Sequence, residues 1–278
     1  MIKLGLIGYP LSHSLSPKIH SAALQSCGLE GDYSLFPIHT DDQQSLGALL
    51  SRVRTGGIHG LNVTIPHKQN VIPLLDELTP TAQSIGAVNT IYLHNNKLVG
   101  DNTDALGFLS DLKRFLTTVT QRHGDLNTLV LGAGGSARAV VYALVSDGWD
   151  VTIAARRIEQ SQKLALQFGN VKAIEFNLQT FQCLNLQLIV NTTPVGMAPD
   201  IDESPWPEKL PFPASAAIYD LVYNPPETKL VQEARCQGLS ATTGLGMLIE
   251  QAALAFEIWT GYKLSREVMF EAVNQVTS

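Results

Sequence analysis

The sequence predicts an α/β protein of two domains. Its 278 residues exceed the usual length of one domain, and a hydrophobic content of 45% is enough for two separate cores. Short apolar runs bounded by Gly, Pro and Asn alternate with amphipathic helical stretches along the chain. One run leads directly into a glycine loop at 132–137, which is typical of a doubly wound parallel sheet.

The first domain is expected to contain short strands with helices between them. Ser16 and Pro17 favour the start of a helix, because serine is a good N-cap and proline suits the first helical position, and Gly28 can end it. The predicted strands are residues 3–7, 33–38, 57–63, 88–93 and 98–99.

A second α/β unit, of the Rossmann type, begins at about Thr103. The pattern predicts helices at 105–116, 137–146 and 160–168, strands at 128–131, 151–154, 188–190 and 218–221, and a proline-rich surface loop at 199–213. Two last helices, at 247–259 and 266–273, are expected to return to the first domain. The predicted division is therefore 1–102 plus 247–278 for one domain and 103–246 for the other.

The composition argues against several classes of protein. A net charge of −6 with only 16% charged residues disfavours a nucleic-acid or membrane-surface partner. Cys27, Cys183 and Cys236 form no C-x-x-C pair and have no histidine at zinc spacing, so we expect buried free thiols in a reducing cytoplasm and no metal site. No signal peptide or spanning apolar run is predicted, and both monomer and homodimer stay open.

The glycine loop has the pattern G-x-G-x-x-A between a predicted strand and a predicted helix. Small residues there let backbone amides and the helix N-terminus approach a pyrophosphate. The loop residues are Gly132, Ala133, Gly134, Gly135, Ser136 and Ala137.

The next predicted strand is followed by Arg156 and Arg157 and has no carboxylate at its end of the kind that binds the ribose of NAD. An arginine pair can bind a 2′-phosphate, so the sequence favours NADP. A solvated arginine pair is the alternative.

Polar residues near the N-terminus allow two interpretations. Pro17 biases Ser16 toward extended geometry, so Ser14 and Ser16 can share one face and bind a carboxylate. A capping role for Ser16 is equally compatible with the pattern.

Lys68 and Asp104 are candidates for acid–base chemistry. We expect Lys68 early in a helix begun near Pro66, where the helix dipole and partial burial disfavour its ammonium form. Asp104 can pair with such a lysine, or it can cap the helix at 105–116. For an isolated lysine or aspartate the surface or capping role is the commoner one.

Taken together, these motifs resemble the shikimate/quinate dehydrogenase family over nearly the whole chain. The matching blocks are Ser12-His13-Ser14-Leu15-Ser16-Pro17 and residues 62–68, 86–90, 101–104, 132–137, 191–197, 219–225 and 244–251. The resemblance implies an NADP-dependent oxidoreductase that reduces 3-dehydroshikimate to shikimate in aromatic amino-acid (chorismate) biosynthesis.

The resemblance also implies residue roles. Lys68 and Asp104 would be the catalytic pair, and Arg156 would meet the 2′-phosphate. The substrate residues would be Ser14, Ser16, Thr64, Lys68, Asn89, Asp104, Tyr223 and Gln251. Beside the glycine loop and the arginine pair, the cofactor residues would be Thr192, Met197, Leu221, Gly244 and Met247.

Two departures from the family pattern are Ala105, where glycine is frequent, and Ala155, where asparagine is frequent. The second removes a possible adenosine contact. Two rival functions stay open, a quinate/shikimate dehydrogenase of broader specificity and a non-catalytic NADP-binding regulator.

Overall fold

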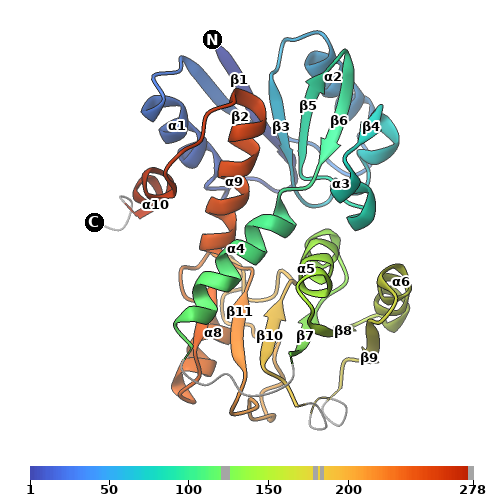
Figure 1. Cartoon of the computed structure of the whole chain (residues 1–278), viewed down its shortest axis with the longest axis vertical. Coiled ribbons are helices and arrows are strands. Elements are labelled where there is room, and N and C mark those ends of the chain that lie inside the picture. The colour runs from blue at the N-terminus through green and yellow to red at the C-terminus, as the bar shows by residue number, and fades with distance from the viewer. Residues whose placement is uncertain (120–125, 178–180, 182–184, 275–278) are drawn as a thin grey trace. The chain divides into compact units, whose positions relative to one another are not determined.

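The computed structural model describes residues 1–119, 126–177, 181 and 185–274 (Figure 1). The chain divides into two compact units, one made of Met1–Gly107 and Ile249–Ser278 and the other of Phe108–Leu248. Within the described residues, no helix is long and apolar enough to cross a membrane. The same residues contain no group of three or more His, Cys, Asp or Glu side chains that could hold a metal ion.

The first unit is built on a mixed sheet with the strand order β2-β1-β3-β5-β6-β4. Strand β1 runs parallel to β2 and β3, whereas β5 runs antiparallel to both β3 and β6. The ends of β1, β3 and β6 and the start of β5 therefore lie at the same edge of the sheet. The strands are β1 Ile2–Gly8, β2 Gly31–Pro37, β3 Gly60–Val63, β4 Glu77–Leu78, β5 Thr90–His94 and β6 Lys97–Asp101.

Helices cover the faces of this sheet. Helix α2 buries Leu46, Leu50 and Val53 in one core cluster with Ile7 and Leu61 of the strands. Helix α1 packs against both β2 and α10. The helices are α1 Ser16–Ser26, α2 Gln43–Arg54, the short 3₁₀ helix η1 Ile72–Leu74, α3 Pro80–Ile85, α9 Leu245–Thr260 and α10 Arg266–Asn274.

A buried histidine lies in this unit among aromatic rings. His20 of α1 stacks on Tyr33 with ring centroids 4.4 Å apart and lies 5.4 Å from the ring of Trp259. Neither ring nitrogen has a hydrogen-bond partner of good geometry among the described atoms. Burial lowers the pKa of His20 to about 3, against a smaller opposite effect of the Asn62 side chain. The imidazole is therefore neutral in the folded protein above about pH 3.

Because the pKa of His20 is lowered, we expect the protein to lose stability in acid. Unfolding exposes an imidazole with the ordinary value of 6.5, so the unfolded state binds more protons at all pH values between the two. The part of the free energy of unfolding that depends on neutral His20 is fully present above pH 6.5. Near pH 4.5 we expect about 3 kcal/mol of it to be lost. Urea unfolding of His20→Phe should show a correspondingly weaker decline between pH 7 and pH 4.5. The matched control is His94→Gln at an exposed position. An unchanged decline in the His20→Phe variant would contradict the prediction.

The second unit is built on a fully parallel sheet with the order β12-β11-β10-β7-β8-β9. The order reverses between β7 and β10, the position at which doubly wound sheets bind ligands beyond the carboxyl ends of their strands. The strands are β7 Asn127–Leu131, β8 Asp150–Ala155, β9 Lys172–Glu175, β10 Leu188–Asn191, β11 Ala217–Asp220 and β12 Ala241–Thr243.

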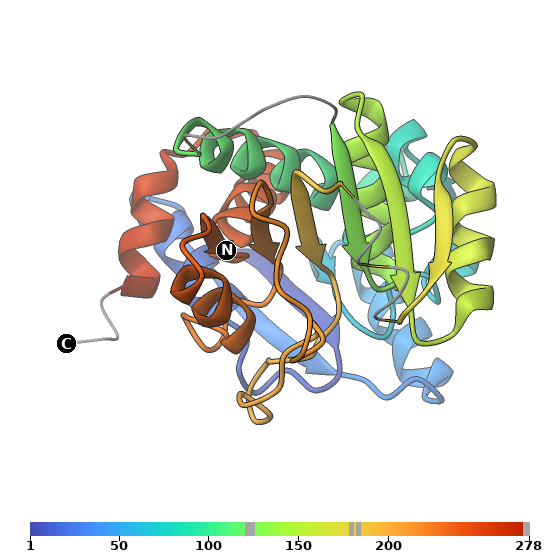
Figure 2. The same cartoon turned by 90° about the horizontal axis from the view of Figure 1, so that it is seen from below.

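Helices lie on both faces of the parallel sheet (Figure 2). Ile218 of β11 packs in the core cluster with α8, whereas its neighbour Tyr219 contacts Phe108 and Phe115 of α4, since successive strand residues point to opposite faces. The helices are α4 Asp104–Thr117, whose residues up to Gly107 belong to the first unit, α5 Gly135–Ser146, α6 Ile158–Phe168 and α8 Lys229–Cys236.

Several predictions about individual segments differ from the structure. The stretch 199–213 has no helix or strand, but it is only partly a surface loop, because Trp206, Leu210 and Phe212 are buried in the core beside α8. Of the cysteines expected to be buried, Cys236 is exposed and Cys27 is half-buried, and both are free thiols. Cys183 lies outside the described residues. The short elements β4, α3, β9, α8 and β12 were not predicted.

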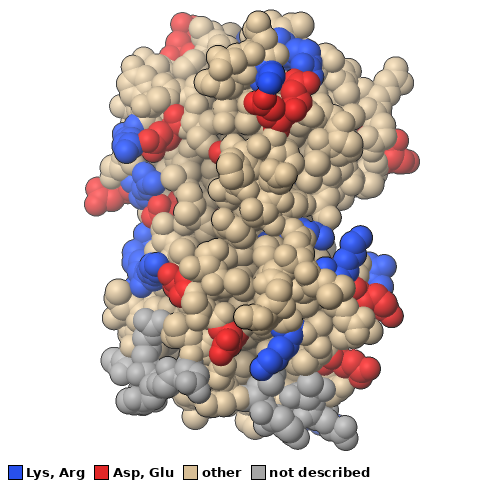
Figure 3. Space-filling view, turned by 45° about the vertical axis from the view of Figure 1, so that its right-hand side comes forward, with Lys and Arg blue, Asp and Glu red and all other residues tan. Residues whose placement is uncertain are grey.

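Surface charge is mixed on the face drawn in Figure 3. There, blue lysine and arginine residues alternate with red acidic residues, and uncharged residues cover most of the surface. Two of the exposed ion pairs are Arg54–Asp76 and Arg235–Glu227.

Candidate active site

A buried ion pair lies at the edge of the first sheet where β3 and β6 end. The Lys68 ammonium donates to the Asp104 carboxylate with an Nζ to Oδ2 distance of 2.6 Å. The side chains are only 10% and 6% exposed. Two charges held this far from water need further hydrogen bonds to be stable, and Asp104 also accepts one from Asn89, with 2.8 Å between Oδ1 and Nδ2.

Lys68 does not lie in a helix, contrary to the prediction. Residues 65–71 form consecutive turns. Hydrogen bonds to residues of other segments fix these turns. The His67 ring bonds the Ile38 carbonyl at 2.7 Å, and the Lys68 carbonyl accepts from the Val88 backbone amide at 2.7 Å. A helix dipole therefore has no part in presenting the ammonium group of Lys68.

Asp104 is the first residue of α4. Its carboxylate accepts hydrogen bonds from Lys68 and Asn89, so of the two roles considered, the pairing role is the one observed. The backbone amide of Asp104 is bonded by the Asn102 side chain at 3.1 Å, which helps to fix the start of the helix.

Asn89, just before β5, connects the ion pair to the last part of the chain. Its Nδ2 lies 3.3 Å from the Gln251 side-chain oxygen on α9 and 2.9 Å from the Thr103 hydroxyl. Its Oδ1 accepts from the Thr103 backbone amide at 2.8 Å, which orients the amide with its nitrogen toward Asp104. Four of the predicted site residues, Lys68, Asn89, Asp104 and Gln251, therefore form one connected cluster in the first unit.

Further buried polar residues, which were not predicted, form hydrogen bonds with Asn89 of this cluster. Asn62 of β3 accepts from the Tyr33 hydroxyl at 2.8 Å and donates to the Asn89 carbonyl at 3.2 Å. Thr90 donates to the Asn89 side-chain oxygen at 3.0 Å. In the sequence these are ordinary polar strand residues, and only the pairing of β3 with β5 brings them together.

Ser14 and Ser16, predicted to bind a carboxylate, lie in the segment after β1, and Thr64, predicted to bind a ring hydroxyl, lies after β3. Thr64 directly follows β3 and its amide bonds the Ile7 carbonyl of β1 at 2.8 Å, which places both strand ends side by side. Ser16 is the first residue of α1 rather than an extended residue, and the preceding Leu15 occupies the N-cap position. Because Leu15 is the N-cap, the alternative capping role of Ser16 is not observed, and the Ser14 hydroxyl accepts from the Ser16 amide at 3.2 Å.

The glycine loop leaves the carboxyl end of β7 beside β10. Gly132 has φ +110°, which favours glycine, and a Cβ there would lie 2.6 Å from the Thr192 hydroxyl oxygen. That hydroxyl donates to the Leu131 carbonyl at 2.7 Å. Gly134 is the N-cap of α5, and a Cβ there would have no described atom within 4 Å. The N-terminus of α5 is therefore open to a ligand, with Ala137 buried behind it.

Arg156 and Arg157 follow β8 and are both exposed. Neither guanidinium has a hydrogen bond or ion pair with another described residue. The last residue of β8, Ala155, carries no carboxylate. The end of β8 can therefore receive an anionic group.

The loops after β10 and β11 are tied together by a buried carboxylate. Asp220 accepts from Asn191 at 2.8 Å and from Thr228 at 2.7 Å. Burial raises the pKa of Asp220 to about 6, against the opposite effect of these hydrogen bonds. Among the predicted cofactor residues on these loops, Leu221 bonds the Asn191 carbonyl through its amide at 2.9 Å, and Met197 is exposed.

Three further predicted residues belong to the second unit. Burial raises the pKa of the Tyr223 phenol, which follows β11. Gly244 packs directly against the Leu221 backbone, leaving no room for a side chain, and Met247 is buried in the first turn of α9.

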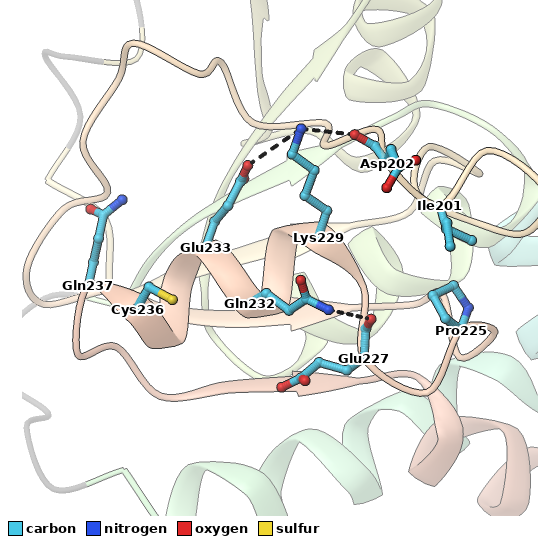
Figure 4. A pocket seen from close by; sticks show the side chains of 9 residues that line it. All are labelled: Ile201, Asp202, Pro225, Glu227, Lys229, Gln232, Glu233, Cys236 and Gln237. Carbon is cyan, nitrogen blue, oxygen red and sulfur yellow. Dashed lines mark hydrogen bonds and ion pairs between the residues drawn. The ribbon is translucent and has the colours of Figure 1, made fainter.

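A surface pocket of about 660 Å³ lies beside α8 (Figure 4). Its lysine is already bonded: Lys229 donates to the Asp202 backbone carbonyl at 2.9 Å and lies 4.0 Å from a Glu233 oxygen. None of the predicted site residues lines it.

Comparison with known families gives matches along most of the chain. Residues 6–91 match a family described as the shikimate dehydrogenase substrate binding domain, and residues 115–194 match the shikimate / quinate 5-dehydrogenase family. Residues 244–273 match the shikimate 5′-dehydrogenase C-terminal domain.

Individual proteins resemble the chain over its whole length. A shikimate dehydrogenase (NADP(+)) of Salinibacter ruber is 40% identical, covering 96% of this chain and 95% of that protein. The crystal structure of shikimate 5-dehydrogenase from Thermus thermophilus in complex with NADP(H) and shikimate has a TM-score of 0.87 at 39% identity, with 99% of each chain covered. Quinate dehydrogenase from Corynebacterium glutamicum in complex with NAD has a TM-score of 0.86 at 31% identity, again with 99% of each chain covered.

Proposed function

The chain belongs to the shikimate dehydrogenase (NADP(+)) family, and on this basis we propose that it catalyses the reversible reduction of 3-dehydroshikimate to shikimate in aromatic amino-acid biosynthesis. The observation that carries the proposal is the buried Lys68–Asp104 ion pair. A non-catalytic NADP-binding regulator would have no chemical need for two charges held out of water.

Lys68 is the proposed acid–base residue. In the reducing direction its ammonium donates a proton to the C3 oxygen of the substrate, and in the reverse direction the neutral amine accepts it. Asp104 holds the lysine in place through the 2.6 Å contact and can accept a hydrogen bond from the C3 hydroxyl of shikimate. NADPH, when bound, supplies the hydride.

The remaining residues of the first unit are proposed to bind the substrate. Ser14 and Ser16 would hold its carboxylate, while Thr64, Asn89 and Gln251 would bind its ring hydroxyls. Tyr223 of the second unit is the further substrate residue that we propose. We accordingly assign residues 1–102 with 247–278 to substrate binding and 103–246 to NADP binding.

The second unit fits an NADP site by its own geometry. The amides at the open N-terminus of α5 suit a pyrophosphate, and the space at Gly134 leaves room for it. The exposed Arg156 and Arg157 suit a 2′-phosphate, and β8 ends without a carboxylate to bind an unmodified ribose. Gly132, Ala133, Gly135, Ser136, Thr192, Met197, Leu221, Gly244 and Met247 complete the proposed set. The free thiols of Cys27 and Cys236 accord with a cytoplasmic location, which we also propose.

One assay separates the candidate functions. The protein is mixed with shikimate or quinate and with NADP⁺ or NAD⁺, and the absorbance of the reduced nicotinamide is followed. We expect turnover with shikimate and NADP⁺ to exceed the other three combinations. Comparable rates with quinate would support the broader dehydrogenase, and no turnover in any combination would support the regulator.

Arginine substitutions test the cofactor preference. Arg156→Ala should raise the KM for NADP(H) more than it lowers kcat, because the lost bonds bind the 2′-phosphate in both ground and transition states. Stability should change by less than about 0.5 kcal/mol, since the side chain is exposed. Arg157→Ala is the matched variant at the adjacent exposed position. If the preference for NADP over NAD is unchanged in the Arg156→Ala variant, another residue recognises the 2′-phosphate of NADP.

A further inference from the structure

Thr103 is the most connected polar residue of the cluster that was not assigned a role. It is buried, with an exposed fraction of 4%, and lies between Asn102 and Asp104 at the start of α4. Its hydroxyl oxygen lies 2.9 Å from Asn89 Nδ2 and 3.0 Å from the backbone carbonyl oxygen of Gln251. A single hydroxyl therefore joins the segment before β5, the start of α4 and the middle of α9.

The donor and acceptor roles at Thr103 follow from its partners. Two oxygens that can only accept lie near the hydroxyl, the Gln251 carbonyl at 3.0 Å and Asn89 Oδ1 at 3.3 Å. The carbonyl is nearer, so the hydroxyl proton points to α9. The lone pairs then face Asn89, whose Nδ2 can only donate. The Asn89 amide cannot be turned around, because its Oδ1 already accepts from the Thr103 backbone amide at 2.8 Å.

The close approach of α9 depends on Gly107 in the first turn of α4, four residues after Thr103. A Cβ at Gly107 would lie 2.8 Å from the Gln251 backbone nitrogen and 2.9 Å from its Cβ. Both values are too short for real side chains, so the two helices meet here backbone to backbone. Such proximity lets a side chain as short as threonine reach the Gln251 carbonyl.

Asn89 has two amide protons and three acceptors in reach. One N–H group donates a hydrogen bond to Asp104 Oδ1 at 2.8 Å. For the other, the Thr103 hydroxyl at 2.9 Å is closer than the Gln251 side-chain oxygen at 3.3 Å. Without the hydroxyl, Gln251 Oε1 is the remaining acceptor among these three, and the glutamine side chain would be drawn toward Asn89.

We infer that Thr103 is a positioning residue that sets the position of the Gln251 side chain for the substrate, by accepting a hydrogen bond from the Asn89 amide and by bonding the α9 backbone. The inference rests on the proposed role of Gln251 in binding a substrate hydroxyl. Thr103 itself need not touch the substrate.

The test is a set of threonine substitutions assayed with shikimate and NADP⁺. Thr103→Val keeps the shape of the side chain and removes the hydroxyl, and Thr103→Ser keeps the hydroxyl. Thr128→Val is the matched control, because Thr128 is also buried and its hydroxyl has no hydrogen-bond partner among the described atoms. We expect Thr103→Val to lower kcat/KM for shikimate by about 10-fold to 100-fold, the range of one misplaced buried hydrogen bond.

Two readouts separate positioning from general damage to the fold. The Kd for shikimate, from calorimetry, should rise in Thr103→Val while the Kd for NADPH stays within about twofold. Thr103→Ser and Thr128→Val should both retain shikimate affinity within about threefold. Equal impairment of Thr103→Val and Thr103→Ser, or equal loss of shikimate and NADPH affinity, would overturn the inference.

A double-mutant cycle tests whether the effect passes through Gln251. In a Gln251→Leu background there is no side-chain oxygen for Asn89 to attract. Adding Thr103→Val should therefore lower shikimate affinity by less than about threefold. Additive losses would overturn the inference. Absence of turnover in the wild-type protein and in Thr128→Val would instead count against the proposed dehydrogenase activity, and calorimetry would still report on Thr103.

Discussion

Replacement of Lys68 by methionine is expected to lower kcat by about 10²-fold or more, the contribution typical of a positioned acid–base group. The KM for shikimate should change less, because the remaining polar groups of the cluster still bind the substrate. Methionine fills most of the volume of the lysine side chain, which is only 10% exposed, so the packing is preserved. Steady-state kinetics with shikimate and NADP⁺ measure the effect.

The same substitution should also destabilise the protein. It leaves the buried Asp104 carboxylate without its ammonium partner, and breaking a buried pair from one side costs about 3–5 kcal/mol. Adding Asp104→Asn removes the second charge, so the double variant should recover much of the stability seen in urea unfolding, without recovering turnover. If Lys68→Met has near-normal kcat, or if the double variant regains activity together with stability, Lys68 is not the acid–base residue.

The sequence predicts best those features whose cause is local. The strand before Gly132 and the helix after it follow from a short apolar run, a glycine loop and an amphipathic pattern, all within about twenty residues. The helix expected at Pro66 was wrong because tertiary hydrogen bonds with the Ile38 carbonyl and the Val88 amide fix the turns around Lys68. No local pattern records those partners.

The polar cluster shows the same limit. Lys68 and Asp104 were candidates from their residue types and positions, and Asn89 and Gln251 were identified through motif resemblance; the pairing of strands and helices then brings them together. Thr103 was missed because a threonine before a helix is most often a cap, and its actual partner on α9 is 148 positions away. Likewise, the proline content of 199–213 predicted a loop but not the burial of Trp206.

Gly134→Asp should separate stability from cofactor binding. Gly134 is the N-cap of α5 with an extended backbone, φ −84° and ψ −168°, which any residue can adopt. Aspartate is a preferred N-cap whose carboxylate accepts from first-turn amides, and negative charge is favourable at this end of the helix dipole. We therefore expect the free energy of unfolding to be unchanged or to rise by a few tenths of a kcal/mol, measured by urea unfolding.

The same carboxylate would occupy the amides and the open space that we assign to the pyrophosphate. Two like charges about 4 Å apart near a protein surface repel by about 4 kcal/mol, so NADPH affinity should fall by about 10²-fold or more. Gly134→Asn is the matched control, since it adds nearly the same volume without charge. Its affinity for NADPH should fall much less. Fluorescence titration with NADPH measures both variants, and shikimate affinity should be retained in each. Unchanged NADPH affinity in Gly134→Asp would mean that the pyrophosphate does not bind at the N-terminus of α5.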